Sequence, residues 1–281
     1  MARVAVVTDS TAYLSEGAAA DHGVLVVPLH VVLGGITGQE NVDLSPADVA
    51  RALHERRVHV TTSRPTPAEF AAAYRAAGSR EVVSVHLSAK LSGTSDSARL
   101  AAREVAADGI EVQVVDSGSV AMGLGFPVIA AAEEAAAGGR LDEVVAAAVA
   151  AASATTTLLY VDTLEHLRRG GRLTAASALV GAALGVKPLL RVEGGEIVLF
   201  EKVRTFSKAI ARLVAVAVET ADGGPVDVAV HHLEAPERAE QLGEDLRAAL
   251  TQVRSLRLSE IGAVVGAHVG PGALGVVLWK R

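Results

Sequence analysis

The chain has 281 residues; half of them are apolar, only 3% are aromatic, and the formal net charge is −6. This length suits one large domain or two of ordinary size, and the apolar content allows a sizeable core. A negative charge without a basic patch argues against nucleic acid as the main partner. The absence of cysteine excludes disulfides, thiolate metal sites and a cysteine nucleophile.

The first half of the chain alternates strand and helix patterns. Strands are predicted at residues 3–7, 24–33, 82–87 and 110–115, and helices after caps at Ser15, Ser45 and Thr66 and at 97–107, 119–137 and 141–152. Repeated strand–helix units with continuously apolar strands predict an α/β fold, with a parallel sheet covered on both faces in a three-layer domain. We assign this domain, which carries the head-group site proposed below, to residues 1–153.

The second half has a different pattern. Strands are predicted at 155–161, 226–231, 261–267 and 273–279, a hairpin at 189–192 and 196–201, and helices at 177–186, 206–219 and 235–250. Hairpins combined with a few helices predict a smaller α+β domain with a mixed sheet. We assign this second domain to residues 154–281.

One segment requires a test for membrane insertion, because residues 144–161 contain no charged side chain. Its length of 18 residues makes it a weak candidate for a membrane span, but Ala, Thr and Ser dominate it. It is interpreted as the end of one helix followed by a buried strand. The N-terminus lacks the apolar length of a signal peptide. We therefore expect a soluble, cytoplasmic protein with no stable membrane insertion.

Hydroxyl side chains gather where the predicted parallel strands end. The segments are Thr8-Asp9-Ser10, Thr61-Thr62-Ser63, Ser88 with Ser92-Gly93-Thr94, and Asp116-Ser117. Ligands of open α/β sheets bind beyond the carboxyl ends of the strands, and a helix N-terminus favours an anion. Each residue alone is better explained as a cap or turn residue. Thr62 and Ser92 together favour an anion site, with Gly93 allowing close approach of the backbone.

No catalytic, metal-binding or cofactor-binding pattern stands out, and neither a catalytic residue nor a metal or cofactor is predicted. Asp9 and Asp116 could be general bases, but aspartate at a strand end is commonly a cap. The chain contains no Gly-x-Ser-x-Gly elbow and no phosphate-binding loop. In the second half Arg172, Arg204 and His268 are candidate anion ligands, although solvated surface charge explains each arginine better when it is taken singly, and a turn-stabilising role explains His268 equally well.

Eight motifs, in order, resemble the DegV family from the first strand to the last. They are Thr8-Asp9-Ser10-Thr11, Thr62-Ser63 with Pro65, Leu91-Ser92-Gly93-Thr94, Asp116-Ser117, Gly170-Gly171-Arg172, Lys187-Pro188, Glu201-Lys202 with Arg204-Thr205, and His268 with Gly270-Pro271-Gly272. No single motif is decisive, but their order and spacing are specific. One departure is Arg64, where the family often has glutamine.

The resemblance implies a fold similar to the dihydroxyacetone-binding part of dihydroxyacetone kinases, with a fatty acid buried between two domains. It also implies a bacterial lipid-binding subunit, not an enzyme, that presents a long-chain fatty acid to a separate ATP-binding kinase subunit. That kinase would form an acyl phosphate for phospholipid synthesis. By the same resemblance, Thr62, Ser63, Ser92, Gly93, Thr94 and His268 hold the lipid, and Arg172 and Arg204 meet the kinase subunit or the phosphate.

Two alternatives to this binding module remain open. One is a stand-alone hydrolase or transferase that uses Asp9 or His268 on a small acidic substrate. The other is a carrier of a different apolar acid. An aliphatic pocket could bind any such tail, because each buried CH₂ contributes about 0.8 kcal/mol and a sixteen-carbon chain on the order of 10 kcal/mol before binding costs.

Overall fold

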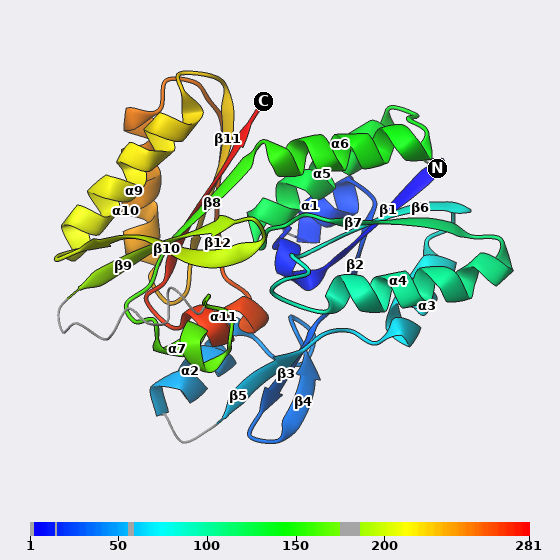
Figure 1. Ribbon diagram of the computed structural model, residues 1–281, viewed down its shortest axis with the longest axis horizontal. Helices are drawn as coiled ribbons and strands as arrows, with labels where there is room; N and C mark the ends of the chain where they lie inside the picture. The colour runs from blue at the N-terminus through cyan, green and yellow to red at the C-terminus, as the bar shows by residue number, and fades with distance from the viewer. Residues whose placement is uncertain (1–2, 15, 56–58, 175–185) are drawn as a thin grey trace. The chain divides into compact units, whose positions relative to one another are not determined.

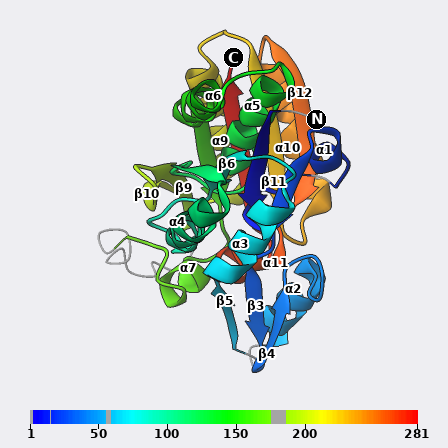
Figure 2. The same ribbon diagram turned by 90° about the vertical axis from the view of Figure 1, so that its right-hand side faces the viewer.

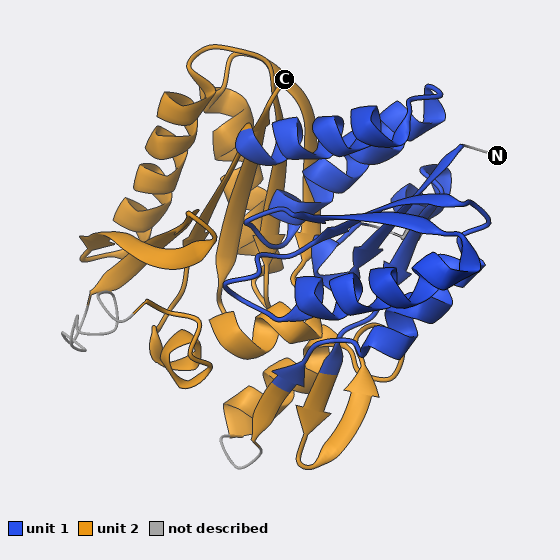
Figure 3. Cartoon of the chain, turned by 45° about the vertical axis from the view of Figure 1, so that its right-hand side comes forward, with its two compact units in different colours: residues 1–30, 62–153 blue, residues 31–61, 154–281 orange. Residues whose placement is uncertain are grey.

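The structure is a computed structural model that describes residues 3–14, 16–55, 59–174 and 186–281. Backbone contacts divide the chain into two compact units, residues 1–30 with 62–153 and residues 31–61 with 154–281 (Figure 3). The expected domains at 1–153 and 154–281 stay a prediction. Residues 31–61 group with the second unit, which therefore holds more residues than the first.

A four-stranded parallel sheet forms the centre of the first unit. Its order is β2 (Val24–Val27), β1 (Val4–Asp9), β6 (Glu81–His86) and β7 (Glu111–Asp116). Valine predominates in these strands, and β6 is almost completely buried. A central strand that is buried on both faces, such as β6, is typical of a parallel sheet that is covered on both faces.

Helices cover both faces of this sheet, which confirms the three-layer prediction (Figures 1 and 2). The helices are α1 (Glu16–Asp21), α3 (Pro67–Ala76), α4 (Thr94–Val105), α5 (Met122–Ala136) and α6 (Leu141–Ser153). Phe70 and Tyr74 of α3 and Ala98 of α4 pack with Val7 and Val82 in one core. Helices α5 and α6 pack against β1, β6 and β7 on the other side.

The second unit contains the predicted mixed sheet, which has six strands. Its order is β10 (Glu196–Val203), β9 (Lys187–Glu193), β8 (Thr155–Tyr160), β13 (Leu274–Lys280), β11 (Val226–His232) and β12 (Val253–Glu260). Only β11 and β12 run parallel. Helices α9 (Phe206–Ala221) and α10 (Pro236–Ala249) place their buried side chains in one core with the strands.

Residues 24–33 form two strands, so the prediction of one strand is wrong. After β2 the chain passes Pro28 and Leu29 and begins β3 (His30–Leu33), which belongs to a three-stranded sheet in the order β4 (Ile36–Gln39), β3, β5 (Val60–Ser63). Proline has no N–H to donate to a sheet, and this ends the first ladder. Helix α2 (Pro46–Glu55) lies between β4 and β5 in the chain.

The strand predicted at 261–267 is also wrong, because this segment contains the helix α11 (Ala263–Val269). Short apolar runs do not distinguish strand from helix by their pattern alone. Helix α11 packs on α2, and Glu40 Oε1 accepts a 2.7 Å hydrogen bond from the Val264 N–H. The edge strand β12 was not predicted, because charged residues interrupt its apolar pattern.

The uncharged run at 144–161 is divided between α6 and β8, as predicted. No helix in the described part of the chain is long and apolar enough to cross a membrane. The predicted cap Ser15 and residues 177–185 of the helix predicted at 177–186 lie outside the described residues.

Candidate functional site

The hydroxyls at the end of β1 form hydrogen bonds with backbone groups of the protein. Thr8 Oγ1 donates to the Val85 carbonyl at 2.8 Å, and Ser10 Oγ accepts from the Leu29 N–H at 3.0 Å. Asp9 caps the short 3₁₀ helix η1 (Ser10–Ala12), with Oδ1 accepting from the Thr11 N–H at 3.1 Å. The hydrogen bonds of these three residues therefore connect strands and turns within the protein. A role as cap and turn residues accounts for their presence at this strand end.

Asp9 also belongs to a buried chain of hydrogen bonds. Its Oδ2 lies 3.0 Å from His86 Nδ1, and His86 Nε2 lies 2.7 Å from Ser84 Oγ. Tyr74 donates to the same Ser84 oxygen at 2.9 Å, and Phe70 packs edge-on against the His86 ring. Although the order Ser–His–Asp matches that of a hydrolase triad, all three side chains are buried without exposed surface. This arrangement stabilises the sheet, and it provides no access for a substrate.

The end of β7 is likewise a turn. Asp116 accepts from the Ala89 N–H at 3.2 Å and from the Gly118 N–H at 2.9 Å. Ser117 Oγ accepts from the Ser119 N–H at 3.2 Å. An aspartate that bonds the backbone two residues ahead is a turn-forming aspartate, and its oxygens are occupied.

The turn between β6 and α4 differs from these two strand ends. Ser92 Oγ lies 2.9 Å from Thr94 Oγ1, so two of the predicted ligands are neighbours. Gly93 is the N-cap of the 12-residue helix α4, and none of the described side chains caps the start of that helix. Its first N–H groups carry a partial positive charge and can donate to an anion. Ser95, the residue after Thr94, is completely buried, and its hydroxyl has no hydrogen-bond partner among the described residues.

Gly93 is in close contact with Arg64. A Cβ added to Gly93 would lie 2.9 Å from Arg64 Cζ, 3.1 Å from its Cδ and closer still to Nη1. Arg64 follows Thr62 and Ser63, which are the last two residues of β5. Within the first unit, the guanidinium of Arg64 therefore lies directly on the turn formed by residues 92–94, which are predicted ligands. Arg64 itself follows two further predicted ligands, Thr62 and Ser63. The sequence marks Arg64 only as a departure from the family pattern.

In the second unit, His268 is in the last turn of α11, not between a strand and the Gly270 turn as the sequence predicted. A Cβ on Gly170 would lie 2.9 Å from His268 Cε1 and closer still to Nδ1. The side chain of Arg172 donates to the Gly170 carbonyl. His166 packs against Gly270 in the same way as His268 packs against Gly170. His166 was not predicted, and only its position four residues before Gly170 could have drawn attention to it.

The electrostatics of this group keep His268 neutral. Burial and, as a second cause, the nearby positive charge of Arg172 together lower the pKa of His268 to about 4. A neutral imidazole can donate from one nitrogen and accept at the other. At neutral pH His268 can therefore donate one hydrogen bond to an anion without carrying a charge.

Two further cations of the second unit differ in their surroundings. Lys187 Nζ lies 2.7 Å from Asp162 Oδ1, which also accepts a 2.6 Å hydrogen bond from the Tyr160 hydroxyl. The hydrogen bond to Asp162 raises the pKa of Lys187. Arg204 is exposed at the end of β10 and forms no ion pair with any described residue. Arg204 is therefore better suited than Lys187 to meet another molecule.

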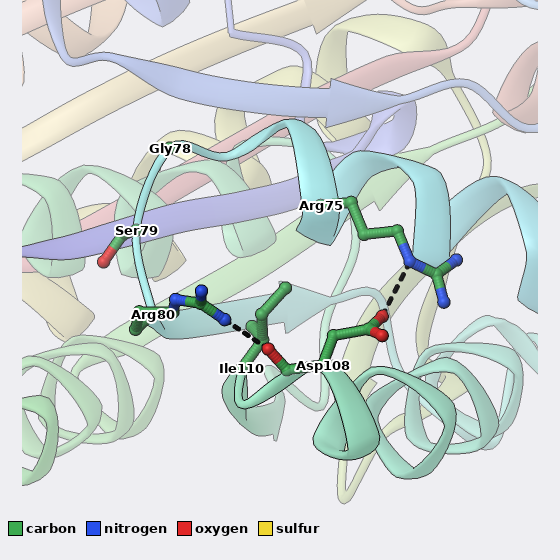
Figure 4. Close-up of a pocket in the computed structure, with 6 residues that line it drawn as sticks. All are labelled: Arg75, Gly78, Ser79, Arg80, Asp108 and Ile110. Atoms are coloured by element: carbon green, nitrogen blue, oxygen red, sulfur yellow. Dashed lines mark hydrogen bonds and ion pairs between the residues drawn. The ribbon is translucent and has the colours of Figure 1, made fainter.

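A pocket in the first unit lies away from all of these residues. It is lined by Arg75, Gly78, Ser79, Arg80, Asp108 and Ile110 and has a volume of about 480 Å³ (Figure 4). Asp108 accepts from Arg75 Nε at 2.8 Å, and its carbonyl accepts from Arg80. Both arginines that line the pocket, Arg75 and Arg80, thus already donate hydrogen bonds to protein oxygens. The described residues contain no cluster of three metal-binding side chains.

Comparison with known proteins decides the family. The sequence model of the DegV family matches residues 3–281. The chain belongs to the DegV family. A DegV domain-containing protein of Streptomyces coelicolor is 55% identical to it, with 99% of each chain covered. Protein DegV of Bacillus subtilis is 37% identical, with 97% of this chain and 98% of the other covered.

Solved structures of the same family have the same fold. A DegV family protein from Thermus thermophilus, described by its fatty acid binding, has a TM-score of 0.93 and 32% identity, covering 99% of this chain and 100% of the other. DegV of Bacillus subtilis, described as a fatty acid binding protein, has a TM-score of 0.91 and 35% identity with full coverage of both chains. This DegV family chain therefore has the α/β fold of proteins for which fatty acid binding is described.

Proposed function

We propose that this DegV family chain binds a long-chain fatty acid and holds its carboxylate at the turn between β6 and α4. One observation carries the proposal: Ser92 and Thr94 lie at the uncapped start of α4, in a chain that aligns over its full length with fatty-acid-binding relatives. The binding role of those relatives also favours a lipid-binding protein over an enzyme.

The chemistry of the turn suits a carboxylate. Hydroxyls and backbone N–H groups donate to carboxylate oxygens, and the partial positive charge of a helix N-terminus favours the ionised form. The proposed ligands are Thr62, Ser63, Ser92, Gly93 and Thr94. The proposal adds His268, whose neutral ring can donate one further hydrogen bond.

The acyl tail would supply most of the binding free energy. With about 0.8 kcal/mol for each buried CH₂, a sixteen-carbon chain contributes on the order of 10 kcal/mol before the costs of association. Aliphatic side chains suffice for such contacts, and only 3% of this chain is aromatic. The head group then determines which apolar molecules bind.

The test is extraction of the purified protein followed by mass spectrometry, together with titration of delipidated protein with palmitate. We expect fatty acid to co-purify, and we expect Ser92→Ala to weaken palmitate binding about 5- to 100-fold, which corresponds to about 1–3 kcal/mol. Ser207→Ala, on the exposed surface of α9, is the matched control. A protein that neither contains nor takes up any fatty acid would contradict the proposal.

The finer part of the proposal is that the bound carboxylate is presented to a separate ATP-binding kinase subunit, which converts it to an acyl phosphate in the cytoplasm. Arg204 is the better test residue, since it is exposed, whereas Arg172 is half-buried and bonded to the Gly170 carbonyl. We expect Arg204→Ala to retain palmitate affinity and to slow acyl phosphate formation by the kinase. Arg103→Ala, an exposed arginine of α4, should change neither.

Loss of palmitate binding in Arg204→Ala would show that Arg204 belongs to the lipid site. Unchanged acyl phosphate formation in that variant would contradict its role with the kinase subunit. Formation of acyl phosphate from ATP by the chain alone would contradict the assignment of the chemistry to a partner.

A further inference from the structure

Arg64 is held at both ends of its backbone. It follows β5 directly and precedes the buried Pro65, which leads into α3. Helix α3 begins with a capping box in which Thr66 Oγ1 accepts from the Glu69 N–H at 3.3 Å and Glu69 Oε2 accepts from the Thr66 N–H at 2.7 Å. Reciprocal capping fixes the direction of the chain entering a helix. The side chain of Arg64 therefore starts from a defined backbone.

The guanidinium lies on Gly93 and is not paired with an acid. The acidic residue in the first turn of α4 is Asp96, and its Oδ1 pairs with Arg99 at 3.2 Å. Arg64 forms no ion pair and no hydrogen bond with any residue in the part of the chain that the structure describes. An exposed arginine without a partner normally extends into water, but this one lies across the turn that carries Ser92 and Thr94.

This position adds what the hydroxyls lack. Ser92 and Thr94 carry no full charge, so they distinguish a carboxylate from a neutral alcohol only through the greater strength of a hydrogen bond to an ionised acceptor. A guanidinium at the same turn adds a full positive charge, whose Coulombic attraction acts on the ionised carboxylate and not on a neutral alcohol.

We propose that Arg64 strengthens the selection of ionised lipids, by placing its positive charge against the head group held at Ser92, Gly93 and Thr94. The inference rests on the proposed function and deepens it, because it names the charge that distinguishes a fatty acid from a neutral lipid of equal length. Arg64 adds to the specificity, and the tail determines most of the affinity.

The experiment compares palmitate with hexadecanol, which has the same number of carbons and no charge. Arg64→Gln keeps a hydrogen-bond donor and removes the charge. We expect it to weaken palmitate binding about 5- to 30-fold and to leave hexadecanol binding within about twofold. The dependence of palmitate affinity on salt should become weaker. Arg103→Gln, on the exposed end of α4, is the control and should alter neither affinity.

The outcomes separate the two proposals. Failure of the unaltered protein to bind palmitate would overturn the proposed function, and with it the role of Arg64. Normal palmitate binding by the Arg64→Gln variant would overturn the role of Arg64 alone. An equal loss of palmitate and hexadecanol would mean that Arg64 supports the shape of the site and does not recognise charge.

A second variant tests the contact itself. Gly93 has φ −77° and ψ 17°, a backbone conformation that alanine also adopts. The Arg64 side chain, and not the backbone conformation of Gly93, therefore opposes the substitution Gly93→Ala. The added methyl group should push the guanidinium off the turn and weaken palmitate binding as Arg64→Gln does. In the double variant the two losses should not add, because both act through the same group. Additive losses would overturn the inference.

Discussion

The imidazole of His268 occupies the space that a side chain on Gly170 would need. A Cβ there would lie 2.9 Å from His268 Cε1 and 3.2 Å from the His166 carbonyl oxygen. Gly170 ends α7 (Glu165–Arg169), and its carbonyl accepts from Arg172. Gly170 thus contacts both Arg172 and His268, which the sequence identified as separate candidates.

The first prediction concerns Gly170→Ala. The residue has φ −73° and ψ −10°, so alanine is allowed by its backbone and is opposed by the His268 ring. We expect a loss of about 1–3 kcal/mol in the free energy of unfolding, measured by urea denaturation, as for other overpacked sites. The double variant Gly170→Ala with His268→Ala should regain most of this loss. If Gly170→Ala lowers the free energy of unfolding as much in the His268→Ala variant as in the unaltered protein, the close contact is contradicted.

The second prediction concerns acid stability. His231 is buried, and burial lowers its pKa to about 4, with the neighbouring His232 as a second cause. Because its folded pKa is below the unfolded value of about 6.5, only the unfolded chain takes up this proton between those values. The stability that the neutral His231 contributes to the free energy of unfolding is therefore fully present above about pH 6.5, and it is lost as the pH falls toward 4. At pH 4.5 this histidine should cost about 2–3 kcal/mol relative to pH 7.

Replacement by a side chain that does not titrate isolates this effect. In His231→Gln, the difference in unfolding free energy between pH 7 and pH 4.5 should shrink by about 2–3 kcal/mol. The exposed His59→Gln should retain the pH dependence of the unaltered protein. An unchanged pH dependence in His231→Gln would show that this histidine can be protonated inside the fold.

The third prediction concerns the buried carboxylate of Asp9. It accepts hydrogen bonds from the Thr11 N–H, the Thr11 hydroxyl, the Leu87 N–H and the His86 ring, at 2.5–3.1 Å. In Asp9→Asn the new NH₂ group faces donors, and a buried donor without an acceptor costs about 1–3 kcal/mol. We expect a loss of at least that size in chemical denaturation. The exposed Asp116→Asn should cost less than about 1 kcal/mol, and equal losses would contradict this argument.

The sequence predicted the fold well where periodicity and caps agree. The capping box at Thr66 and Glu69 marked α3, and the apolar runs marked β6 and β7. It failed at residues 261–267, where small and apolar residues suit a strand and a helix equally. It also failed at the short strands β4 and β5 and at the charged edge strand β12, because none of the three has a continuous apolar run.

The candidate site was predicted in part. Ser92 and Thr94 are neighbours, as local sequence suggests, but the hydroxyls of Thr8 and Ser10 bond to residues that no local pattern identifies. The contact of Arg64 with Gly93 joins positions 29 residues apart, so only folding reveals it. Which cation approaches a turn is a property of tertiary structure.

The last prediction concerns Ser95 in the first turn of α4, whose completely buried hydroxyl has no partner in the part of the chain that the structure describes. Burying a hydroxyl costs free energy that no hydrogen bond offsets here. Ser95→Ala removes that group and substitutes a better helix former, so the free energy of unfolding should stay equal or rise by up to about 1 kcal/mol. Ser84→Ala is the matched control, because that buried hydroxyl bonds to His86 and Tyr74 and its loss should cost about 1–3 kcal/mol. Thermal and urea denaturation of the lipid-free protein measure both. If Ser95→Ala destabilises the protein as much as Ser84→Ala does, then the Ser95 hydroxyl has a partner in solution, such as an internal water molecule, and the start of α4 is more tightly bonded than its hydrogen bonds indicate.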